Sequence, residues 1–253
     1  MKNAATVPIE NLNSEPYSSV VCYPRADSDE IQIRIKELQS LGVEQVEFSG
    51  AATAFTLPVM GKGYVGIVAV AHIKGARYAL KMQRIDSERE SLEHEAELLK
   101  LANTVNVGPR FVAVSKRFLV MELIDGDQLE GWLQTHREKV AVKKVLEDIL
   151  EQCWRLDEIS LDHGELSKAP KHLLVNKVDK PFIVDFETAS TTRNASNVTS
   201  VCQFLFQGNS NVEKEIAAII EERNRPQLVG LLKNYRRKRT RDAFEDLLSA
   251  CLT

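Results

Sequence analysis

Hydrophobic and polar positions along the chain predict a strand-rich half followed by a helix-rich half. Short apolar runs between polar or glycine turns predict strands at 43–48, 57–60, 66–73, 77–82, 111–114 and 117–123. Farther along, apolar residues at helical spacing predict helices at 127–134, 137–158, 197–206 and 212–222, and a last helix that begins near Pro226. Strands followed by helices predict the α+β class, with an antiparallel sheet first.

The first 50 residues predict a small unit of their own. Residues 1–17 are polar and contain two prolines, so we expect them to be irregular. The run S-S-V-V-C-Y at 18–23 predicts a strand that Pro24 ends. A helix is then expected from Asp27, with an apolar stripe at Ile31, Ile35, Leu38 and Leu41, and Gly42 ends it. With the strand at 43–48, this predicts a strand–helix–strand appendage over residues 1–50.

Composition narrows the class of protein. The chain has 253 residues, 43% of them hydrophobic, which is enough to bury a core. A net charge of −3 gives no general attraction to nucleic acid or membranes. The four cysteines lack metal-ligand spacing, which is typical of reduced thiols in the cytoplasm. The apolar runs are far shorter than the roughly 20 residues of a membrane span, so we expect a cytoplasmic protein without a membrane partner.

A glycine-rich hairpin is the first candidate for chemistry. The pattern G-x-G-x-x-G-x-V is formed by Gly61, Gly63, Gly66 and Val68, with Lys62 between the first two glycines. A dinucleotide-binding fingerprint needs a helix directly after its glycines, whereas here a strand follows. A lysine, Lys81, lies on the next strand. A glycine hairpin backed by a strand lysine is the arrangement that covers ATP in protein kinases, although glycines that only serve turns would give the same pattern.

The helix after Lys81 offers a partner for it. Ser87 and Glu90 form a capping-box signal, and the apolar face of the helix contains Leu92, Ala96 and Leu99. Glu95 lies at the edge of that face, where a buried carboxylate would need a positive partner. The other glutamates of this segment, Glu88, Glu90, Glu93 and Glu97, are alternatives.

Two acidic motifs flank a predicted hairpin at 173–175 and 182–184. The first is H-G-E-L, with Glu165, and the second is D-F-E, which begins at Asp185. Phosphoryl transfer uses one carboxylate to orient the acceptor hydroxyl and another to hold Mg²⁺ against the phosphates. Asp162 competes with Glu165 for the first role, but its place before His163 favours a part in the loop structure.

Taken in order, these features over residues 55–190 resemble an atypical serine/threonine protein kinase of the compact RIO-like and archaeal type. H-G-E-L is similar to the catalytic loop H-R-D-L, and D-F-E to the metal motif D-F-G. The resemblance implies a two-lobed fold, with a sheet lobe at 51–124 and a helical lobe at 125–253 after the appendage at 1–50. It also implies transfer of the ATP γ-phosphoryl group to a protein hydroxyl with Mg²⁺ or Mn²⁺.

The resemblance also assigns roles to residues. Lys81 would hold the phosphates with Glu95 as its partner, under a flap formed by Gly61, Lys62, Gly63, Gly66 and Val68. Met121 would line the adenine pocket, and backbone groups of Glu122 and Leu123 would bind the adenine edge. Glu165 would be catalytic, and Asp185 would hold the metal. His172 would be the second metal ligand when the chain is aligned on the strand that follows it.

Several positions depart from the kinase pattern. The expected catalytic Asp is Glu165, the expected Asn is Pro170 or His172, and the glycine after D-F is Glu187. His is a poor ligand for Mg²⁺ and a fair one for Mn²⁺, while Lys171 could contact phosphate instead. An active kinase and a nucleotide-binding pseudokinase or scaffold therefore both stay open, as does a small-molecule kinase of the same fold. Retention of Lys81 and Asp185 favours activity.

A basic run, K-N-Y-R-R-K-R-T-R, occupies residues 233–241. Such a run is most often a solvated helix face. The alternative is a local patch for RNA or an acidic partner.

Overall fold

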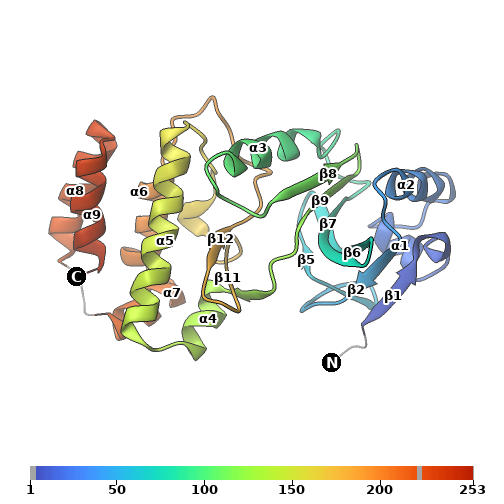
Figure 1. The fold of residues 1–253 in the computed structure, drawn as a ribbon, viewed down its shortest axis with the longest axis horizontal. Coiled ribbons are helices and arrows are strands. Elements are labelled where there is room, and N and C mark those ends of the chain that lie inside the picture. Colours follow the sequence, from blue (N-terminus) through green and yellow to red (C-terminus); the bar gives the residue numbers. More distant parts are fainter. Residues whose placement is uncertain (1–3, 221–223, 253) are drawn as a thin grey trace. The chain divides into compact units, whose positions relative to one another are not determined.

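The computed structural model describes residues 4–220 and 224–252 (Figure 1). The chain divides into two compact units. The first consists of Met1–Glu97 and Arg110–Leu123, and the second of Leu98–Pro109 and Ile124–Thr253. An antiparallel sheet dominates the first unit and helices dominate the second, which confirms the predicted α+β class.

The first unit contains a seven-stranded sheet in the order β1-β2-β6-β7-β9-β8, with β5 paired to β6. All of its paired strands are antiparallel. The strands are β1 (Ala5–Pro8), β2 (Gln45–Phe48), β5 (Gly61–Lys62), β6 (Gly66–Ile73), β7 (Ala76–Gln83), β8 (Phe111–Val114) and β9 (Phe118–Glu122). A separate hairpin is formed by β3 (Ala52–Ala54) and β4 (Leu57–Val59). The long central strands β6 and β7 carry the glycine hairpin and Lys81.

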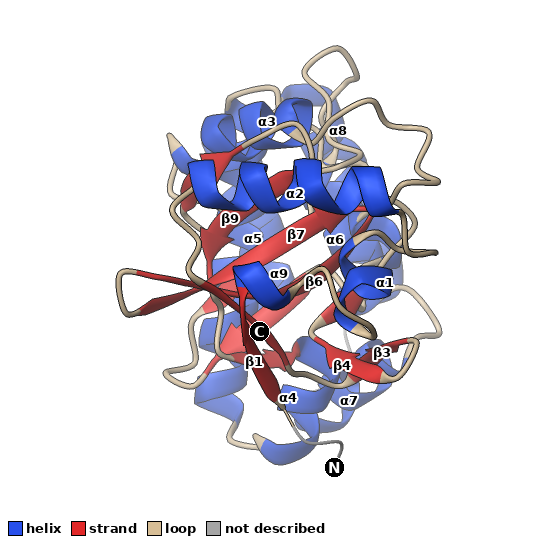
Figure 2. Cartoon of the chain, turned by 90° about the vertical axis from the view of Figure 1, so that its right-hand side faces the viewer, coloured by secondary structure: helices blue, strands red, loops and turns tan. Residues whose placement is uncertain are grey.

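One face of this sheet is covered by the N-terminal helices. A short 3-10 helix η1 (Ile9–Asn11) and helix α1 (Tyr17–Val21) precede α2 (Ser28–Ser40), which lies across β7 and β9 in Figure 2. Asp27 caps α2 by accepting hydrogen bonds from the N–H groups of Asp29 and Glu30. The buried stripe Ile31, Ile35 and Leu38 shares one hydrophobic core with strands β2, β6, β7 and β9.

Two predictions for the N-terminal segment were wrong. Residues 18–23, expected as a strand, lie largely in helix α1, because burial of Val20, Val21 and Cys22 outweighs the strand preference of a short β-branched run. The segment 1–17, expected to be irregular, contributes β1, which pairs with β2 from Ala5 opposite Phe48 to Pro8 opposite Gln45.

The helix after Lys81 starts later than its capping box predicted. Helix α3 runs from Glu93 to Asn103. Ser87 does not cap it, because the Ser87 hydroxyl accepts a hydrogen bond from the N–H of Arg89 within the preceding loop. The hydroxyl of Ser91 accepts instead from the N–H of Glu93, at the true start of the helix.

The second unit is built around the long helix α5 (Lys139–Glu158), which contacts α6, α7, α9 and β12. The other helices are α4 (Leu129–Thr135), α6 (Asn197–Phe206), α7 (Asn211–Ile219), α8 (Arg225–Lys238), α9 (Arg241–Leu252) and the 3-10 helix η2 (Leu166–Lys168). A small antiparallel sheet consists of β10 (Gly126–Gln128), β11 (Leu173–Asn176) and β12 (Pro181–Ile183). No helix among the described residues is long and apolar enough to cross a membrane.

Three helix predictions in this unit needed correction. Asp127 and Gln128, expected in a helix, pair with β11 as part of β10. Helix α7 ends at Ile219, and the predicted continuation to Glu222 lies outside the described residues. A separate helix, α9, follows the predicted last helix after a left-handed residue, Arg239, whose φ is 50°.

Candidate active site

The central strand β7 carries Lys81 into the interior of the first unit. Lys81 pairs with Val68 of β6 on one side and with Leu119 of β9 on the other. Its Nζ lies 2.9 and 2.8 Å from the two carboxylate oxygens of Glu95 on α3. Both residues are more than nine-tenths buried. A buried ammonium needs a compensating carboxylate, and Glu95 supplies it.

The glycine hairpin lies beside this pair on β5 and β6. Gly61 is opposite Val68, and the N–H of Gly63 donates to the carbonyl of Gly66 at 2.8 Å across the tip. A Cβ on Gly66 would come within 2.9 Å of the Met82 carbonyl and 3.1 Å of the Lys81 Cγ. Gly66 is therefore required for the close approach of β6 to the lysine. At Gly63 the nearest atom to such a Cβ would be 3.6 Å away, so that position is open.

Lys62 has a neighbour that the sequence did not suggest. Its Nζ lies 4.6 Å from the ring centroid of Tyr23, a cation–π distance. The guanidinium of Arg84 lies 4.9 Å from the same ring. These contacts join the glycine hairpin to the segment between α1 and α2.

The three residues predicted to bind adenine are Met121 and Glu122, which end β9, and Leu123, which follows it. Met121, opposite Ala79 of β7, is half-buried, as are Glu122 and Leu123. The N–H of Glu122 donates to the carbonyl of Arg110 at 2.8 Å, and its carboxylate accepts from the N–H of Arg110 at 3.0 Å. The N–H of Glu122 is thus used within the sheet.

In the second unit, the loop before η2 is organised by a buried histidine. His163 is fully buried, and its Nε2 donates to the carbonyl of Val184 at 3.0 Å, which fixes this nitrogen as the protonated one. Burial lowers the pKa of His163 from 6.5 to about 4, so the ring is neutral near pH 7. The ring also packs against Phe186, with centroids 5.1 Å apart. His163 therefore joins the H-G-E-L loop to the D-F-E segment.

Three candidate side chains come together here. His172 Nε2 lies 3.5 Å from a carboxylate oxygen of Glu165, and its Nδ1 lies 3.8 Å from Oδ2 of Asp185. One donor atom from each residue lies within 4.8 Å of the others. His172 is 7% exposed, and its buried Nδ1 has no hydrogen-bond partner in the described part of the chain. The imidazole ring lies between two carboxylates, and its unpaired buried Nδ1 faces Asp185, which fits a metal ligand set.

The backbone around Asp185 supports this cluster. Asp185 has a φ of 70°, a left-handed conformation that is uncommon for residues other than glycine. Phe186 is buried directly after it, against Gly108, where a Cβ would approach the Phe186 ring to 2.9 Å. The burial of Phe186 thus anchors Asp185, whose carboxylate is about one-third exposed.

The remaining candidates of this segment are Asp162, Pro170, Lys171 and Glu187, and of these Glu187 has a carboxylate oxygen within 4.8 Å of one of Asp185. Asp162 is buried, accepts hydrogen bonds from Arg193 Nε at 2.8 Å and the Ser196 N–H at 3.2 Å, and pairs through its backbone with Ser190. The Asp162 carboxylate therefore holds the loop together through these hydrogen bonds. Pro170 is half-buried and Lys171 is exposed, while Glu187 is half-buried.

Sequence reasoning missed two residues that position the H-G-E-L loop. Asn197, at the start of α6, accepts a hydrogen bond from the N–H of His163 at 2.8 Å and donates to the carbonyl of Leu161 at 2.7 Å. Asp157 of α5 in turn accepts from the Asn197 side chain at 2.8 Å and from the Tyr235 hydroxyl at 2.8 Å. Burial raises the pKa of Asp157. For Asp157, the one signal in the sequence was a carboxylate next to the apolar stripe of α5.

The basic run is partly used within the second unit. Tyr235 is buried, Arg239 donates to the carbonyl of Ala195, and Arg241 forms a bidentate ion pair with Glu151 at 2.6 and 2.8 Å. The pKa of Arg241 is raised, chiefly by its hydrogen bonds to Glu151. All six cations of the run are exposed, and four of them have no ion pair or side-chain hydrogen bond to a described residue outside the run, namely Lys233, Arg236, Arg237 and Lys238.

Comparison with known proteins agrees with this site. Residues 71–202 match the family described as RIO domain, which is slightly more than half of the chain. An uncharacterized protein of Methanocaldococcus jannaschii is 33% identical over 96 residues, which cover 38% of this chain and 79% of that relative. The chain belongs to the RIO domain family, an atypical kinase family with kinase-like transfer of phosphoryl groups from ATP. The match includes Lys81, Glu95, Glu165 and Asp185, and begins after the glycine hairpin at 61–68.

Proposed function

We propose that this protein transfers the γ-phosphoryl group of ATP to a serine or threonine hydroxyl of a protein. The observation that carries the proposal is the buried pair of Lys81 and Glu95. A buried ion pair contributes little to stability compared with apolar residues of the same volume. Its presence beside a glycine hairpin is better explained by a need to hold an ammonium for phosphate oxygens.

In the first unit, Lys81 is proposed to hold the phosphates, with Glu95 fixing the direction of its side chain. The hairpin with Gly61, Lys62, Gly63, Gly66 and Val68 is proposed to cover them. The open space at Gly63 supports this, because backbone N–H groups can approach a phosphate where no side chain intervenes. Met121 is proposed to line the adenine pocket. The carbonyl of Glu122 and the backbone of Leu123 are proposed to bind the adenine edge, since the N–H of Glu122 is already paired.

In the second unit, Asp185 and His172 are proposed to hold a divalent metal, Mg²⁺ or Mn²⁺. When bound, such an ion neutralises charge on the phosphates. Glu165 is proposed to accept the proton of the acceptor hydroxyl, and its side chain is 39% exposed, so a substrate can reach it. Neutral His163 and Asn197 position the loop from which Glu165 extends.

Two alternatives use the same site. A nucleotide-binding pseudokinase or scaffold would need the first unit's residues but no working carboxylate at Glu165. A small-molecule kinase would use the same residues with a different acceptor. We propose the same functional division as from sequence, into 1–50, 51–124 and 125–253. The first segment shares its hydrophobic core with the sheet of the second. RNA or an acidic protein is proposed as a further partner, which would bind Lys233, Arg236, Arg237 and Lys238 of the basic run.

Transfer of radiolabelled phosphate from ATP tests the proposal. The protein is incubated with Mg²⁺ or Mn²⁺, alone for autophosphorylation and with a mixed protein substrate. We expect phosphoserine or phosphothreonine in the wild type, none with Asp185→Ala, and a loss of about 10²-fold or more with Glu165→Ala. Lys36→Ala, which removes an exposed cation of α2 outside the proposed site, serves as the control. Nucleotide binding without turnover in either metal would favour the pseudokinase, and no nucleotide binding would reject both interpretations.

A further inference from the structure

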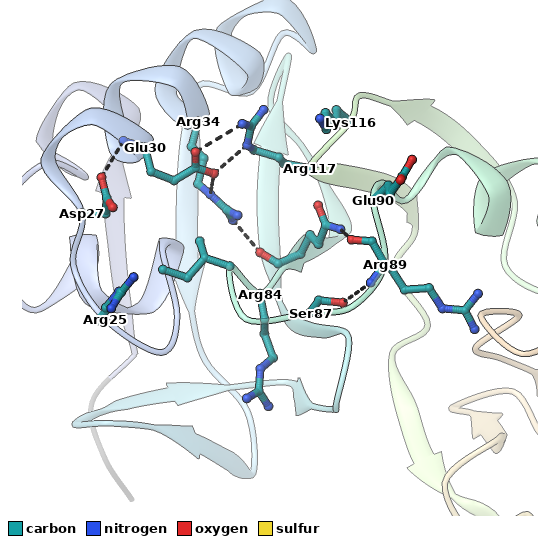
Figure 3. A pocket seen from close by; sticks show the side chains of 12 residues that line it. Arg25, Asp27, Glu30, Arg34, Arg84, Ser87, Arg89, Glu90, Lys116 and Arg117 are labelled. Carbon is teal, nitrogen blue, oxygen red and sulfur yellow. Dashed lines mark hydrogen bonds and ion pairs between the residues drawn. The ribbon is translucent and has the colours of Figure 1, made fainter.

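The first unit contains a second polar cavity, separate from the pair of Lys81 and Glu95. It has a volume of about 370 Å³, within the usual range for small-molecule sites. Its walls come from three segments: the start of α2, the loop after β7 and the turn between β8 and β9 (Figure 3). Neither Lys81 nor the glycines of the hairpin line it.

Positive charge predominates in this cavity. Six cationic side chains line it: Arg25, Arg34, Arg84, Arg89, Lys116 and Arg117. Three carboxylates also line it, those of Asp27, Glu30 and Glu90. The excess is therefore three positive charges, in a chain whose net charge is −3. A concave surface with one sign of charge concentrates ligands of the opposite sign.

Some of these charges are already neutralised by neighbours. Arg117 forms ion pairs with Glu30 at 2.6 Å and with Glu37 at 2.5 Å. The Asp27 carboxylate accepts the capping hydrogen bonds from the N–H groups of Glu30 and Asp29, and these bonds lower its pKa. Arg84 pairs with Asp86 outside the cavity lining. The carboxylate of Glu30 is shared between Arg117 and Arg34, whose Nε lies 2.8 Å from it, whereas Arg25 and Lys116 form no ion pair among the described residues.

The cationic nitrogens that remain come from two sides of the cavity, from Arg25 and Arg34 around the start of α2 and from Lys116 in the turn between β8 and β9. Arg34 is 1% exposed, and its Nε and Nη1 bond to Glu30 and to the carbonyls of Val21 and Gln83. Its Nη2 has no hydrogen-bond partner within residues 4–220 and 224–252. Arg25 and Lys116 are exposed, and neither forms an ion pair or side-chain hydrogen bond with another described residue. A fixed guanidinium nitrogen at the floor and two mobile cations at the rim are arranged for an anion.

We propose that this cavity binds a phosphate monoester, carried by a small molecule or by a phosphorylated residue. A phosphate monoester has a charge between about −1.5 and −2 near pH 7 and three acceptor oxygens, which suits three cationic groups that face it from two sides of the cavity. A single carboxylate offers two oxygens and one charge. Guanidinium groups such as Arg34 bind phosphate oxygens with well-defined geometry, and a lysine such as Lys116 adds a point charge.

The test is a titration followed by ¹H–¹⁵N NMR, with inorganic phosphate, with phosphoserine and with chloride at matched ionic strength. Wild-type protein is saturated with a non-hydrolysable ATP analogue, so that phosphate cannot bind at the Lys81 site. We expect phosphate and phosphoserine, but not chloride, to shift resonances of residues 83–90 and 115–117. Binding of phosphoserine at least as strong as that of inorganic phosphate would support a phosphate monoester as the ligand, and binding of inorganic phosphate without phosphoserine would overturn it.

The variant that decides the question is Arg25→Ala with Lys116→Ala, since both side chains are exposed and their loss should leave the fold intact. Affinity for phosphate should fall by about tenfold or more, because two charge-assisted contacts are lost. Lys36→Ala, an exposed cation of the same helix α2 outside the cavity, is the matched control and should change nothing. Equal affinities in the wild type and the double variant, or equal shifts with chloride, would overturn the proposal. Nucleotide affinity, measured on the same samples, tests the proposed kinase site independently.

Discussion

Lys81 Nζ lies within 2.9 Å of both carboxylate oxygens of Glu95, and both side chains are almost completely buried. The two residues come from different elements, a central strand and the first turn of a helix. Desolvation of two charges costs free energy that their attraction only partly offsets. The pair therefore constrains the fold as well as the proposed site.

The first prediction concerns removal of one member of this pair. Glu95→Ala leaves the Lys81 ammonium buried beside a cavity, and we expect it to lower the free energy of unfolding by about 3 kcal/mol. The double variant Lys81→Met with Glu95→Leu should be less destabilised than Glu95→Ala alone, because no charge is left buried. Urea denaturation followed by circular dichroism measures both.

A matched control for this experiment lies on the same helix. Glu97 is exposed, and Glu97→Ala should change the free energy of unfolding by no more than about 0.5 kcal/mol. If the double variant is as unstable as the sum of the single variants, the two side chains are not coupled in the way described here.

The prediction of this pair from sequence succeeded because its signals are local. Lys81 follows a strand pattern, and Glu95 lies at the edge of an apolar helix face. The start of the helix was misplaced, since Ser87 forms a loop hydrogen bond that resembles a cap in sequence. The five-residue helix α1 was also missed, because so short an apolar run carries no period that separates strand from helix.

Positions fixed by distant partners were beyond sequence reasoning. Arg34 donates to a carbonyl 49 positions away, and Asn197 accepts from a backbone group 34 positions away. No sequence pattern near Arg34 or Asn197 indicates these distant partners. His172 could be placed only by alignment on the strand that follows it, and the structure brings its ring between Glu165 and Asp185.

The second prediction separates two glycines of the hairpin. Gly66→Ala places a methyl group 2.9 Å from the Met82 carbonyl, so β6 and β7 must shift, and we expect a loss of about 1–3 kcal/mol in stability. Gly63→Ala meets no atom closer than 3.6 Å and should leave the unfolding midpoint nearly unchanged. Its effect should appear as weaker ATP binding. Equal stability of the two variants would show that β6 is not held against Lys81.

The third prediction concerns the choice of metal. An imidazole favours Mn²⁺ over Mg²⁺, whereas an amide oxygen suits Mg²⁺. His172→Asn should therefore raise the ratio of activity with Mg²⁺ to activity with Mn²⁺ by about tenfold, measured by phosphate transfer at saturating ATP. Lys180→Ala, at an exposed position in the turn between β11 and β12, should leave the ratio as it is in the wild type. An unchanged ratio in His172→Asn would exclude His172 from the metal ligand set.

The fourth prediction follows from the buried imidazole of His163. Burial lowers the pKa of this ring from 6.5 to about 4. Above pH 6.5 the ring is neutral in both folded and unfolded chains, so no free energy is lost. As the pH falls from 6.5 to about 4, the unfolded chain takes up a proton that the folded chain resists, and stability falls. The pKa difference corresponds to about 3 kcal/mol over this window.

Urea denaturation at several pH values between 4 and 7 measures this slope. His163→Asn removes the titrating ring, so the variant should be less stable at pH 7, where the hydrogen bond to the Val184 carbonyl is disturbed, but should lose less stability on acidification. His94→Ala, which removes an exposed histidine, should keep the wild-type slope. Because His163 joins the H-G-E-L loop to the D-F-E segment, phosphate transfer in the wild type should decline as the pH approaches about 4, where the ring of the folded chain takes up its proton. An identical slope in His163→Asn would place the proton uptake elsewhere in the chain.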